Sequence, residues 1–243
     1  MRFKNIFLIG TSHIAKQSLD QIKEIIITKK PGIVAVELDQ RRLHALFSKE
    51  KHKVRLSDIK HIGLRGYLFA LLGGWLQRKL GNIVGVAPGS EMKLAIQLAH
   101  ESGARIALID QDIELTLRKL SDQLTWREKW HFIVDLVQGV LFPKREITKY
   151  GLSEFDLTKV PSKKLIKQLI GHVKIRYPNI YDVLVHQRNV HMARNLLKIS
   201  AQQPGTTILA VVGAGHEEDM IVLLKKFSRA MEVVNPADYR KGS

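Results

Sequence analysis

The amino-acid sequence predicts an α/β protein with a central, mostly parallel (mixed) sheet flanked by helices and a helical insertion before the last strands. Two observations predict this class. Short apolar segments rich in Val and Ile alternate with longer segments whose apolar residues recur at helical spacing, as in βαβ units. From Ser121 to Gln203, only the helical spacing is found. We expect residues 1–243 to form a single domain, with 121–203 as the helical insertion, because 243 residues can bury a sizeable core.

The elements follow from apolar patterns and from the residues that end them. The expected strands are Phe3–Ile9, Ile33–Val36, Ile83–Val86, Ile106–Ile109 and Thr207–Val212, with Met231–Val234 closing the sheet. The expected helices are Ile14–Lys30, which ends at Pro31-Gly32, Ser90–Ser102, which is capped by Ser90, and Glu217–Arg229. Prolines should interrupt the helical insertion at three positions: Pro143, Pro161 and Pro178.

Composition and charge exclude several classes of protein. The absence of Cys excludes disulfide scaffolds, thiolate zinc sites, iron–sulfur clusters and thiol nucleophiles. The formal net charge is +16, and half of it lies between Lys159 and Lys198, where nine Lys and Arg face one acid, Asp182. This block is either a solvated helix face or a surface for an acidic partner or an anionic membrane. No module for specific nucleic-acid recognition accompanies it.

The N-terminal segment and the longest apolar segment bear on localisation. Met1–Gly10 is too short and too strand-like for a signal peptide, so we expect a cytoplasmic protein. Gly66–Leu76 (GYLFALLGGWL) is shorter than the roughly 20 apolar residues of a membrane-spanning helix. It could lie on a membrane surface or on a second copy of the chain, so we expect peripheral membrane association or a homodimer.

Polar residues stand directly after four of the predicted strands. Gly10-x-x-His13 follows the first strand and Gly213-x-x-His216 the last, while Glu37 and Asp110 follow two others. Ligands of open parallel sheets bind outside the carboxyl ends of the strands, so these side chains are candidates for one site. Each also has a structural interpretation, since His and Gly are common in tight turns and Asp110 could cap the next helix.

The chemistry that suits this set is metal-assisted hydrolysis. Imidazoles and a carboxylate hold a divalent ion such as Mn, Co or Zn and leave a position open for water. His13 and His216 would be ligands, and Glu37 either the third ligand or the general base. Arg41 lies four residues after Glu37 and could orient a carboxylate or bind an anionic group, which leaves Arg42 as the more exposed neighbour. A surface role for Arg41 is the alternative.

The segments around these residues resemble a known family. They are Leu8–Ile14 (LIGTSHI), Val34–Asp39 (VAVELD), Pro88–Met92 (PGSEM), Leu108–Ile113 (LIDQDI), Gln187–Asn189 (QRN) and Val212–His216 (VGAGH). In this order they resemble the TraB/PrgY (pheromone shutdown) family, which is related to Tiki proteases, erythromycin esterases and ChaN-like haem-binding proteins. The resemblance covers residues 6–216.

The resemblance implies a metal-dependent hydrolytic site built on the two Gly-x-x-His motifs and a Glu. His13, Glu37 and His216 would be its core, with Arg188 and Glu91 nearby. Two positions depart from the family pattern, because Gln187 replaces a Glu and Gln111 follows Asp110 where an Arg is usual. Gln187 keeps a hydrogen-bonding amide but carries no charge. The family's membrane spans do not follow here, which implies a soluble form.

Two functions from different classes remain open on the sequence alone. The first is a metal-dependent hydrolase of the TraB type with a peptidase-like activity on a peptide or protein substrate. The second is a non-catalytic binding protein of the same fold, which would hold an acidic partner or a membrane through its basic helical region. The set of His13, Glu37 and His216 favours the enzyme, whereas Gln187 and the basic block favour the binding protein.

Overall fold

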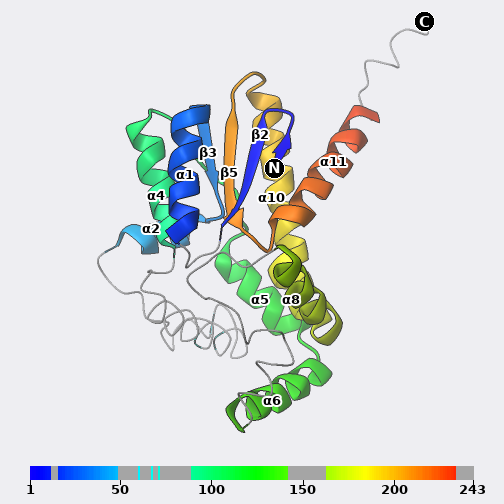
Figure 1. Cartoon of the computed structure of the whole chain (residues 1–243). Coiled ribbons are helices and arrows are strands. Elements are labelled where there is room, and N and C mark those ends of the chain that lie inside the picture. The colour runs from blue at the N-terminus through cyan, green and yellow to red at the C-terminus, as the bar shows by residue number, and fades with distance from the viewer. Residues whose placement is uncertain are drawn as a thin grey trace, which may run out of the picture.

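The protein contains a five-stranded sheet in the order β1-β2-β5-β3-β4 (Figure 1). The computed structural model describes residues 1–11, 16–48, 60, 67, 71, 89–141 and 163–233. Strands β2 (Ile6–Thr11), β3 (Ile33–Val36), β4 (Arg105–Leu108) and β5 (Ile208–Gly213) are parallel, and β1 (Arg2–Phe3) is antiparallel to β2. The last parallel strand, β5, lies between β2 and β3, so it brings the end of the chain into the centre of the sheet. The mixed α/β class predicted from the sequence is confirmed.

The first predicted strand, Phe3–Ile9, is a hairpin rather than one strand. Its arms are β1 and β2, which pair at Arg2 with Phe7 and at Phe3 with Ile6. Lys4 at the turn has a φ of 49°, in the left-handed region. The apolar pattern conceals this turn because Lys4-Asn5 interrupts it by only two residues. The hairpin places β1 on the outer side of β2, at one end of that strand.

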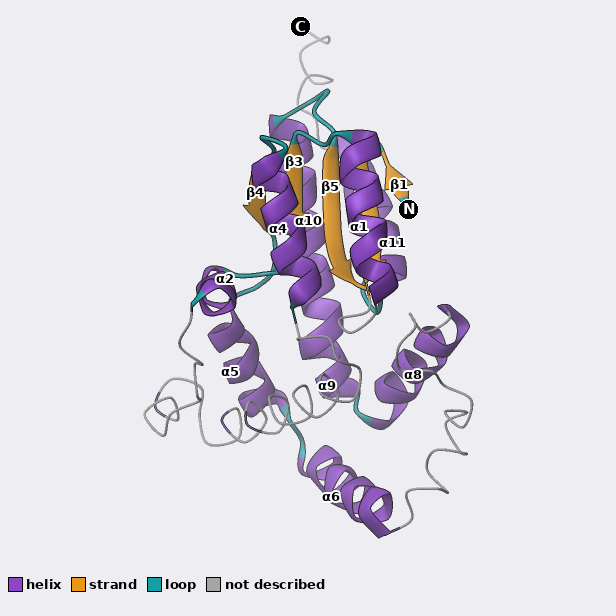
Figure 2. Ribbon diagram, turned by 60° about the vertical axis from the view of Figure 1, so that its left-hand side comes forward, coloured by secondary structure: helices purple, strands orange, loops and turns teal. Residues whose placement is uncertain are grey.

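Helices cover both faces of the sheet (Figure 2). Helices α1 (Lys16–Lys29) and α4 (Ser90–Glu101) pack on one face, where Ile22, Ile26 and Met92 join the apolar side chains of β3 and β5. Helices α10 (Gln187–Gln202) and α11 (Glu217–Val233) pack on the other, through residues such as Met192 and Leu224. Burial on both faces accounts for the nearly continuous apolar sequence of these strands. Every residue of β5 is buried.

The remaining helices of the described chain lie beyond the carboxyl ends of the parallel strands (Figure 2). They are α2 (Gln40–Phe47), α5 (Ile113–Gln123), α6 (Trp126–Leu141), α8 (Lys163–Arg176) and α9 (Pro178–Tyr181), followed by the π-helical turn η2 (Asp182–His186). Pro178 begins α9, and only Tyr177 separates it from the end of α8, which confirms the break predicted there. Helix α10 follows η2 without a loop, and its apolar side chains belong to the hydrophobic core. The segment predicted as a helical insertion therefore ends in a helix of the core.

Two predicted elements differ from the structure. Met231–Val234 is not a strand, because α11 continues through Val233 and includes Met231. The β-branched residues there simply end an amphipathic helix. Ser90 does not cap α4: it is the first helical residue, and the cap position is Gly89, with a φ of 82° and no side-chain cap bond. A left-handed φ suits glycine, which carries no Cβ.

Several predictions fall on other parts of the chain. The strand Ile83–Val86 and the breaks at Pro143 and Pro161 lie outside the described residues. Of the apolar segment Gly66–Leu76, only Tyr67 and Leu71 are described, so the homodimer stays a prediction. Within the described ranges, no helix is both long enough and apolar enough to cross a membrane.

Candidate functional site

Glu37 lies at the carboxyl end of β3, in contact with the neighbouring strand β5. Its backbone N–H donates to the carbonyl of Val211 at 3.1 Å, and its Oε2 accepts a hydrogen bond from the backbone N–H of Gly213 at 2.6 Å. The residue is 6% exposed. Because both contacts come from β5, the β3–β5 pairing fixes the position of this carboxylate. A hydrogen bond from a backbone N–H to a charged carboxylate is among the stronger kinds in proteins.

His216 lies in the turn between β5 and α11, and its ring is held from both sides. Nδ1 lies 2.6 Å from Oδ1 of Asn189 on α10, and Nε2 lies 3.3 Å from Oε1 of Glu37. His216 is 8% exposed, and Asn189 is fully buried. Because an amide oxygen can only accept a hydrogen bond, Asn189 keeps a proton on Nδ1 and turns Nε2 toward Glu37. Asn189 is a site residue that the sequence analysis did not identify.

Arg188, the residue before Asn189, joins two carboxylates at the ends of different strands. Its Nη2 donates to Glu37 Oε1 and, at 2.5 Å, to Asp110 Oδ2, while Nε donates to Asp110 Oδ1 at 3.1 Å. Nη1 donates to the carbonyl of Leu184, in the π-helical turn, at 3.0 Å. Burial alone would lower the pKa of Arg188, but the charges and hydrogen bonds of Glu37 and Asp110 raise it above its ordinary value.

Asp110 follows β4 and is paired with two arginines. Besides Arg188, it accepts a hydrogen bond from Arg42 on α2. Burial alone would raise the pKa of Asp110, but the hydrogen bond and charge of Arg188, and then the charge of Arg42, hold this pKa below its ordinary value. Asp110 is therefore not the helix cap that its sequence position allowed. Asp112 caps α5 by accepting the N–H groups of Glu114 and Leu115.

The two arginines of α2 have the reverse of their expected positions. Arg42 is the inner residue, with a side chain 28% exposed and paired with Asp39 and Asp110. Arg41 is the outer one, 57% exposed, and it pairs with Asp112, the cap of α5, and with Glu114 of α5 instead of with Glu37. The reason is the cap of α2. Asp39 accepts the backbone N–H of both arginines, and the third residue after a cap can fold back onto the cap carboxylate.

Three other predicted site residues are His13, Glu91 and Gln187. His13 lies in the segment 12–15, outside the described residues. Glu91 is buried in the first turn of α4. Gln187 donates to Asp182 at 2.7 Å and to Gln123 at 3.4 Å, so its amide is directed to α5 and η2. Gln187 stands where the family usually has a Glu. Because its amide bonds to Asp182 and Gln123, this difference leaves the charges around Glu37 and Asp110 unchanged.

The predicted metal site can be compared with the side chains in place. Within the described part of the chain, no group of three His, Cys, Asp or Glu side chains could hold a metal ion. Two of the three predicted ligands, Glu37 and His216, do face each other, and an oxygen acceptor orients the ring from behind, as is usual for a metal-binding imidazole. An imidazole nitrogen and a carboxylate oxygen suit zinc, cobalt or manganese. The described residues therefore fit two ligands of such a site.

The contact has two chemical interpretations. If His216 is doubly protonated, its Nε2 makes an ion pair with Glu37. If it is neutral with its proton on Nδ1, the Nε2 lone pair is directed at a carboxylate, an arrangement that a cation between the two groups would stabilise. Nδ2 of Asn189 is buried and has no hydrogen-bond partner among the described residues. It is a donor within the same amide group that holds His216.

Comparisons with known proteins identify relatives along nearly the whole chain. A model of the TraB/PrgY/gumN family matches residues 3–226. The chain is 36% identical over 233 residues to a protein of Methanocaldococcus jannaschii named "Uncharacterized protein MJ1365", covering 94% of this chain and 55% of that protein. It is 24% identical over 235 residues to the human "TraB domain-containing protein", covering 87% of this chain and 60% of the relative. The mouse protein of the same name is 25% identical over 237 residues, with the same coverage. The chain thus spans little more than half of the length of these relatives.

Proposed function

Because the chain belongs to the TraB/PrgY/gumN family, we propose that it is a metal-dependent hydrolase with a peptidase-like activity. The observation that carries this proposal is the contact of His216 Nε2 with Glu37 Oε1 at 3.3 Å, with Asn189 orienting the ring from behind. His13, from the first Gly-x-x-His motif, is the proposed third ligand. A divalent ion bound there would supply a water of lowered pKa and polarise a carbonyl group.

The protein's own groups would hold Glu37 in place as a ligand. Its Oε2 accepts a hydrogen bond from the N–H of Gly213 and its Oε1 accepts one from Arg188, so both carboxylate oxygens have fixed positions. Arg188 is itself held by Asp110, which keeps the guanidinium from turning away from Glu37. The side chains of Glu37, Arg188 and Asp110 are at most 14% exposed, so their charges act with little screening by water.

Metal binding and peptide cleavage test the proposal in sequence. The chelator-treated protein is titrated with Mn, Co and Zn by calorimetry, and a mixed-sequence peptide library is then followed by mass spectrometry with and without metal. We expect one ion per chain and metal-stimulated cleavage, with cleavage lost in Glu37→Gln. Glu101→Gln is the matched control, because Glu101 is an exposed carboxylate at the end of α4. Cleavage that survives Glu37→Gln would contradict the proposed role.

The second candidate function is binding to an anionic membrane surface or an acidic partner through the basic region that includes α8. In that helix Lys167 and Lys174 are exposed, whereas Arg176 is neutralised by Asp135 at 2.5 Å. This function predicts salt-sensitive binding to anionic vesicles that is lost in Lys167→Gln/Lys174→Gln and survives His216→Ala. Vesicle binding without any metal uptake would favour this candidate over the hydrolase.

A further inference from the structure

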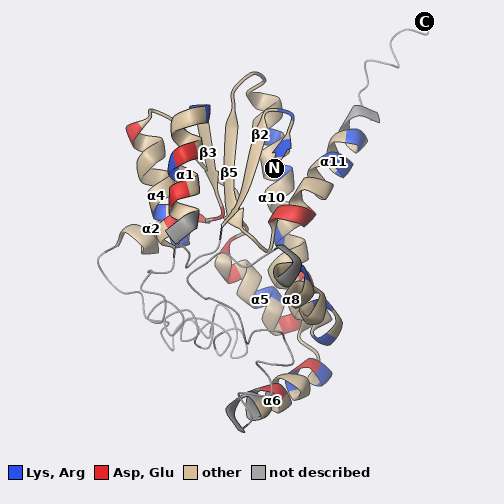
Figure 3. Cartoon of the chain, viewed as in Figure 1, with Lys and Arg blue, Asp and Glu red and all other residues tan. Residues whose placement is uncertain are grey.

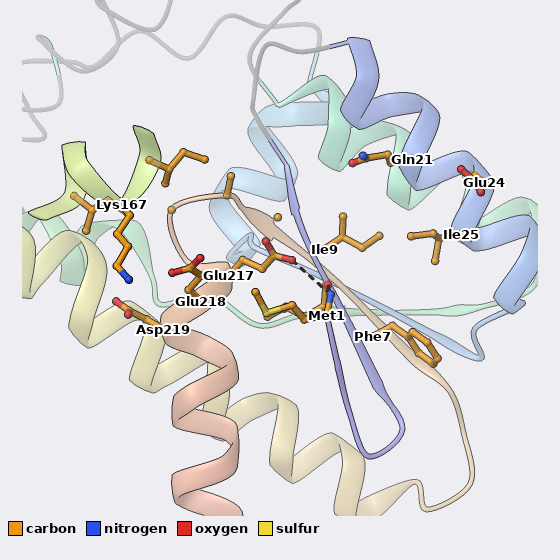
Figure 4. A pocket seen from close by; sticks show the side chains of 16 residues that line it. Met1, Phe7, Ile9, Gln21, Glu24, Ile25, Lys167, Glu217, Glu218 and Asp219 are labelled. Carbon is orange, nitrogen blue, oxygen red and sulfur yellow. Dashed lines mark hydrogen bonds and ion pairs between the residues drawn. The ribbon is translucent and has the colours of Figure 1, made fainter. Parts of the chain in front are cut away.

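A pocket of about 540 Å³ opens beside the candidate site at the outer side of β2 (Figure 4). Its walls come from Met1, β2, α1, α8, the turn before α11 and the first turn of α11. Gly215, which directly precedes His216, is one of its lining residues. The pocket therefore borders the turn that carries the candidate ligand, although it does not include Glu37 or His216 themselves.

The lining combines aliphatic side chains with an excess of negative charge. Ile9, Ile25 and Ile170 contribute apolar surface from three different elements. Four carboxylates line the pocket against two cations, Lys167 and the ammonium group of Met1; they are Glu24, Glu217, Glu218 and Asp219. Three of the four belong to the acidic first turn of α11 (Figure 3). In a chain with a net charge of +16, a negative pocket selects for cationic ligands.

A primary ammonium group is already bound in this pocket. The ammonium of Met1 lies 3.5 Å from Oε1 of Glu217 and donates to the carbonyl of Leu8 at 2.5 Å (Figure 4). The backbone N–H of Leu8 in turn donates to the carbonyl of Met1 at 2.8 Å. A carboxylate and a strand carbonyl together thus hold an amine next to an extended backbone. This part of the lining thus has the geometry to hold a primary ammonium group.

The edge of β2 in the pocket can accept another strand. On its outer side, β2 pairs with β1 at Ile6 and Phe7 and with Met1 at Leu8. Beyond Leu8, among the described residues, no strand pairs with this side of β2, and Gly10 lines the pocket there. An exposed sheet edge binds an extended peptide through main-chain hydrogen bonds, and adjacent pockets select its side chains.

We propose that this pocket binds an extended peptide segment that carries a Lys or Arg side chain, or a free amino terminus, beside an aliphatic side chain. The peptide adds to the edge of β2 at Gly10. Its cationic groups meet the carboxylates on the two sides of the pocket, Glu24 of α1 and Glu218 of α11, and its aliphatic side chains meet Ile25 and Ile170 (Figure 4). That the bound segment is a substrate rests on the proposed hydrolase function, whereas the binding itself does not depend on a metal. The pocket then sets the substrate class as basic peptides.

Binding is measured by fluorescence anisotropy in the presence of a chelator, which separates it from catalysis. The probe is an acetylated, fluorescein-labelled octapeptide of alternating Lys and Leu, compared with the same peptide carrying Gln at every Lys position. We expect the Lys peptide to bind about tenfold more tightly than the Gln peptide. Glu24→Gln/Glu218→Gln should remove most of this difference. The matched control is Glu101→Gln/Asp122→Asn, two exposed carboxylates outside the pocket, which should keep it.

Three results would overturn the proposal. They are equal affinity for the Lys and Gln peptides, an equal loss of affinity in the control variant, and displacement of the probe by free spermidine at the same concentration as by unlabelled peptide. The last result would assign the pocket to small amines instead of peptides. The anisotropy assay contains a chelator, so its result does not depend on the metal titration. Selective peptide binding by a protein that takes up no metal would contradict only the hydrolase. Metal uptake by a protein that does not select the Lys peptide would contradict only the pocket.

Discussion

Nε2 of His216 lies 3.3 Å from Oε1 of Glu37, although the two residues follow different strands and are separated by most of the chain. The contact exists because β5 enters the sheet beside β3, so that the ends of these strands adjoin. The hydrogen bond from Gly213 N–H to Glu37 joins the same two strand ends. A histidine from the last strand and a carboxylate from an early one thus become one unit.

Removing Arg188 should destabilise the fold strongly. Arg188→Met leaves Glu37 and Asp110 buried without their shared partner, and breaking a buried ion pair costs about 3–5 kcal/mol. Chemical denaturation measures the difference. Arg229→Met, at an exposed position of α11, should change the free energy of unfolding by less than about 0.5 kcal/mol. Equal effects of the two substitutions would contradict the structural role of Arg188.

Stability should fall in acid partly because of Asp110. Its pKa in the folded protein lies below the ordinary value of 3.8, so its contribution is fully present above that pH and is lost as the pH falls through the folded pKa. The free energy of unfolding of the wild type should therefore approach that of Asp110→Asn as the pH decreases from 5 to 2. Urea denaturation at several pH values gives both curves. A constant gap between them would contradict the lowered pKa.

Asn189 should control the orientation of His216. Asn189→Leu removes the acceptor for Nδ1, and loss of such a partner typically lowers metal affinity about 10- to 100-fold. Asn189→Asp keeps an acceptor oxygen at this position and should retain most of the affinity. Calorimetric titration compares the variants. If Leu and Asp substitutions lowered metal affinity equally, the hydrogen bond to Nδ1 would not be the reason.

Gly10 should tolerate no side chain. A Cβ at this position would lie 3.0 Å from the Cα of Ala214 and 3.1 Å from the Cβ of Glu217, so Gly10→Ala should cost about 1–3 kcal/mol. Gly171→Ala is the matched control within α8. Its Cβ would meet nothing within 4 Å, and replacing a helical glycine by alanine should stabilise the protein by about 0.5–1 kcal/mol. Thermal unfolding of both variants tests whether the close approach at Gly10 is the reason that alanine destabilises the protein there and stabilises it at Gly171.

The arrangement of strand ends could be predicted from the sequence because it depends on local patterns. Buried apolar segments that end in Glu37, Asp110 and Gly213-x-x-His216 are recognisable, and parallel strands bring their carboxyl ends to one edge. The β1–β2 turn was not predictable, because Lys4-Asn5 barely interrupts the apolar pattern. Met231 was predicted in a strand because the end of an amphipathic helix shows the same short apolar spacing.

Contacts between distant residues could not be predicted in this way. The positions of Arg41 and Arg42 depend on which residue caps α2, since a shift of one residue turns a side chain by about 100°, and the cap is Asp39. Asn189 belongs to the segment Gln187–Asn189 that resembles the family, but its role is not evident from the sequence, because a buried Asn in an amphipathic helix is unremarkable until its partner His216 is known. The acidic pocket likewise combines β2, α1, α8 and α11, which only the folded chain brings together.

Metal affinity of the wild type beside His216→Ala, Glu37→Gln and His100→Ala tests the central claim most directly. The chelator-treated proteins are titrated with Mn, Co and Zn, and the bound metal is counted by elemental analysis. We expect one ion per wild-type chain, loss of binding in His216→Ala and Glu37→Gln, and unchanged binding in His100→Ala, whose imidazole is exposed on α4. A wild type that binds no metal, or variants that all bind it equally, would contradict the claim that Glu37 and His216 form a metal site.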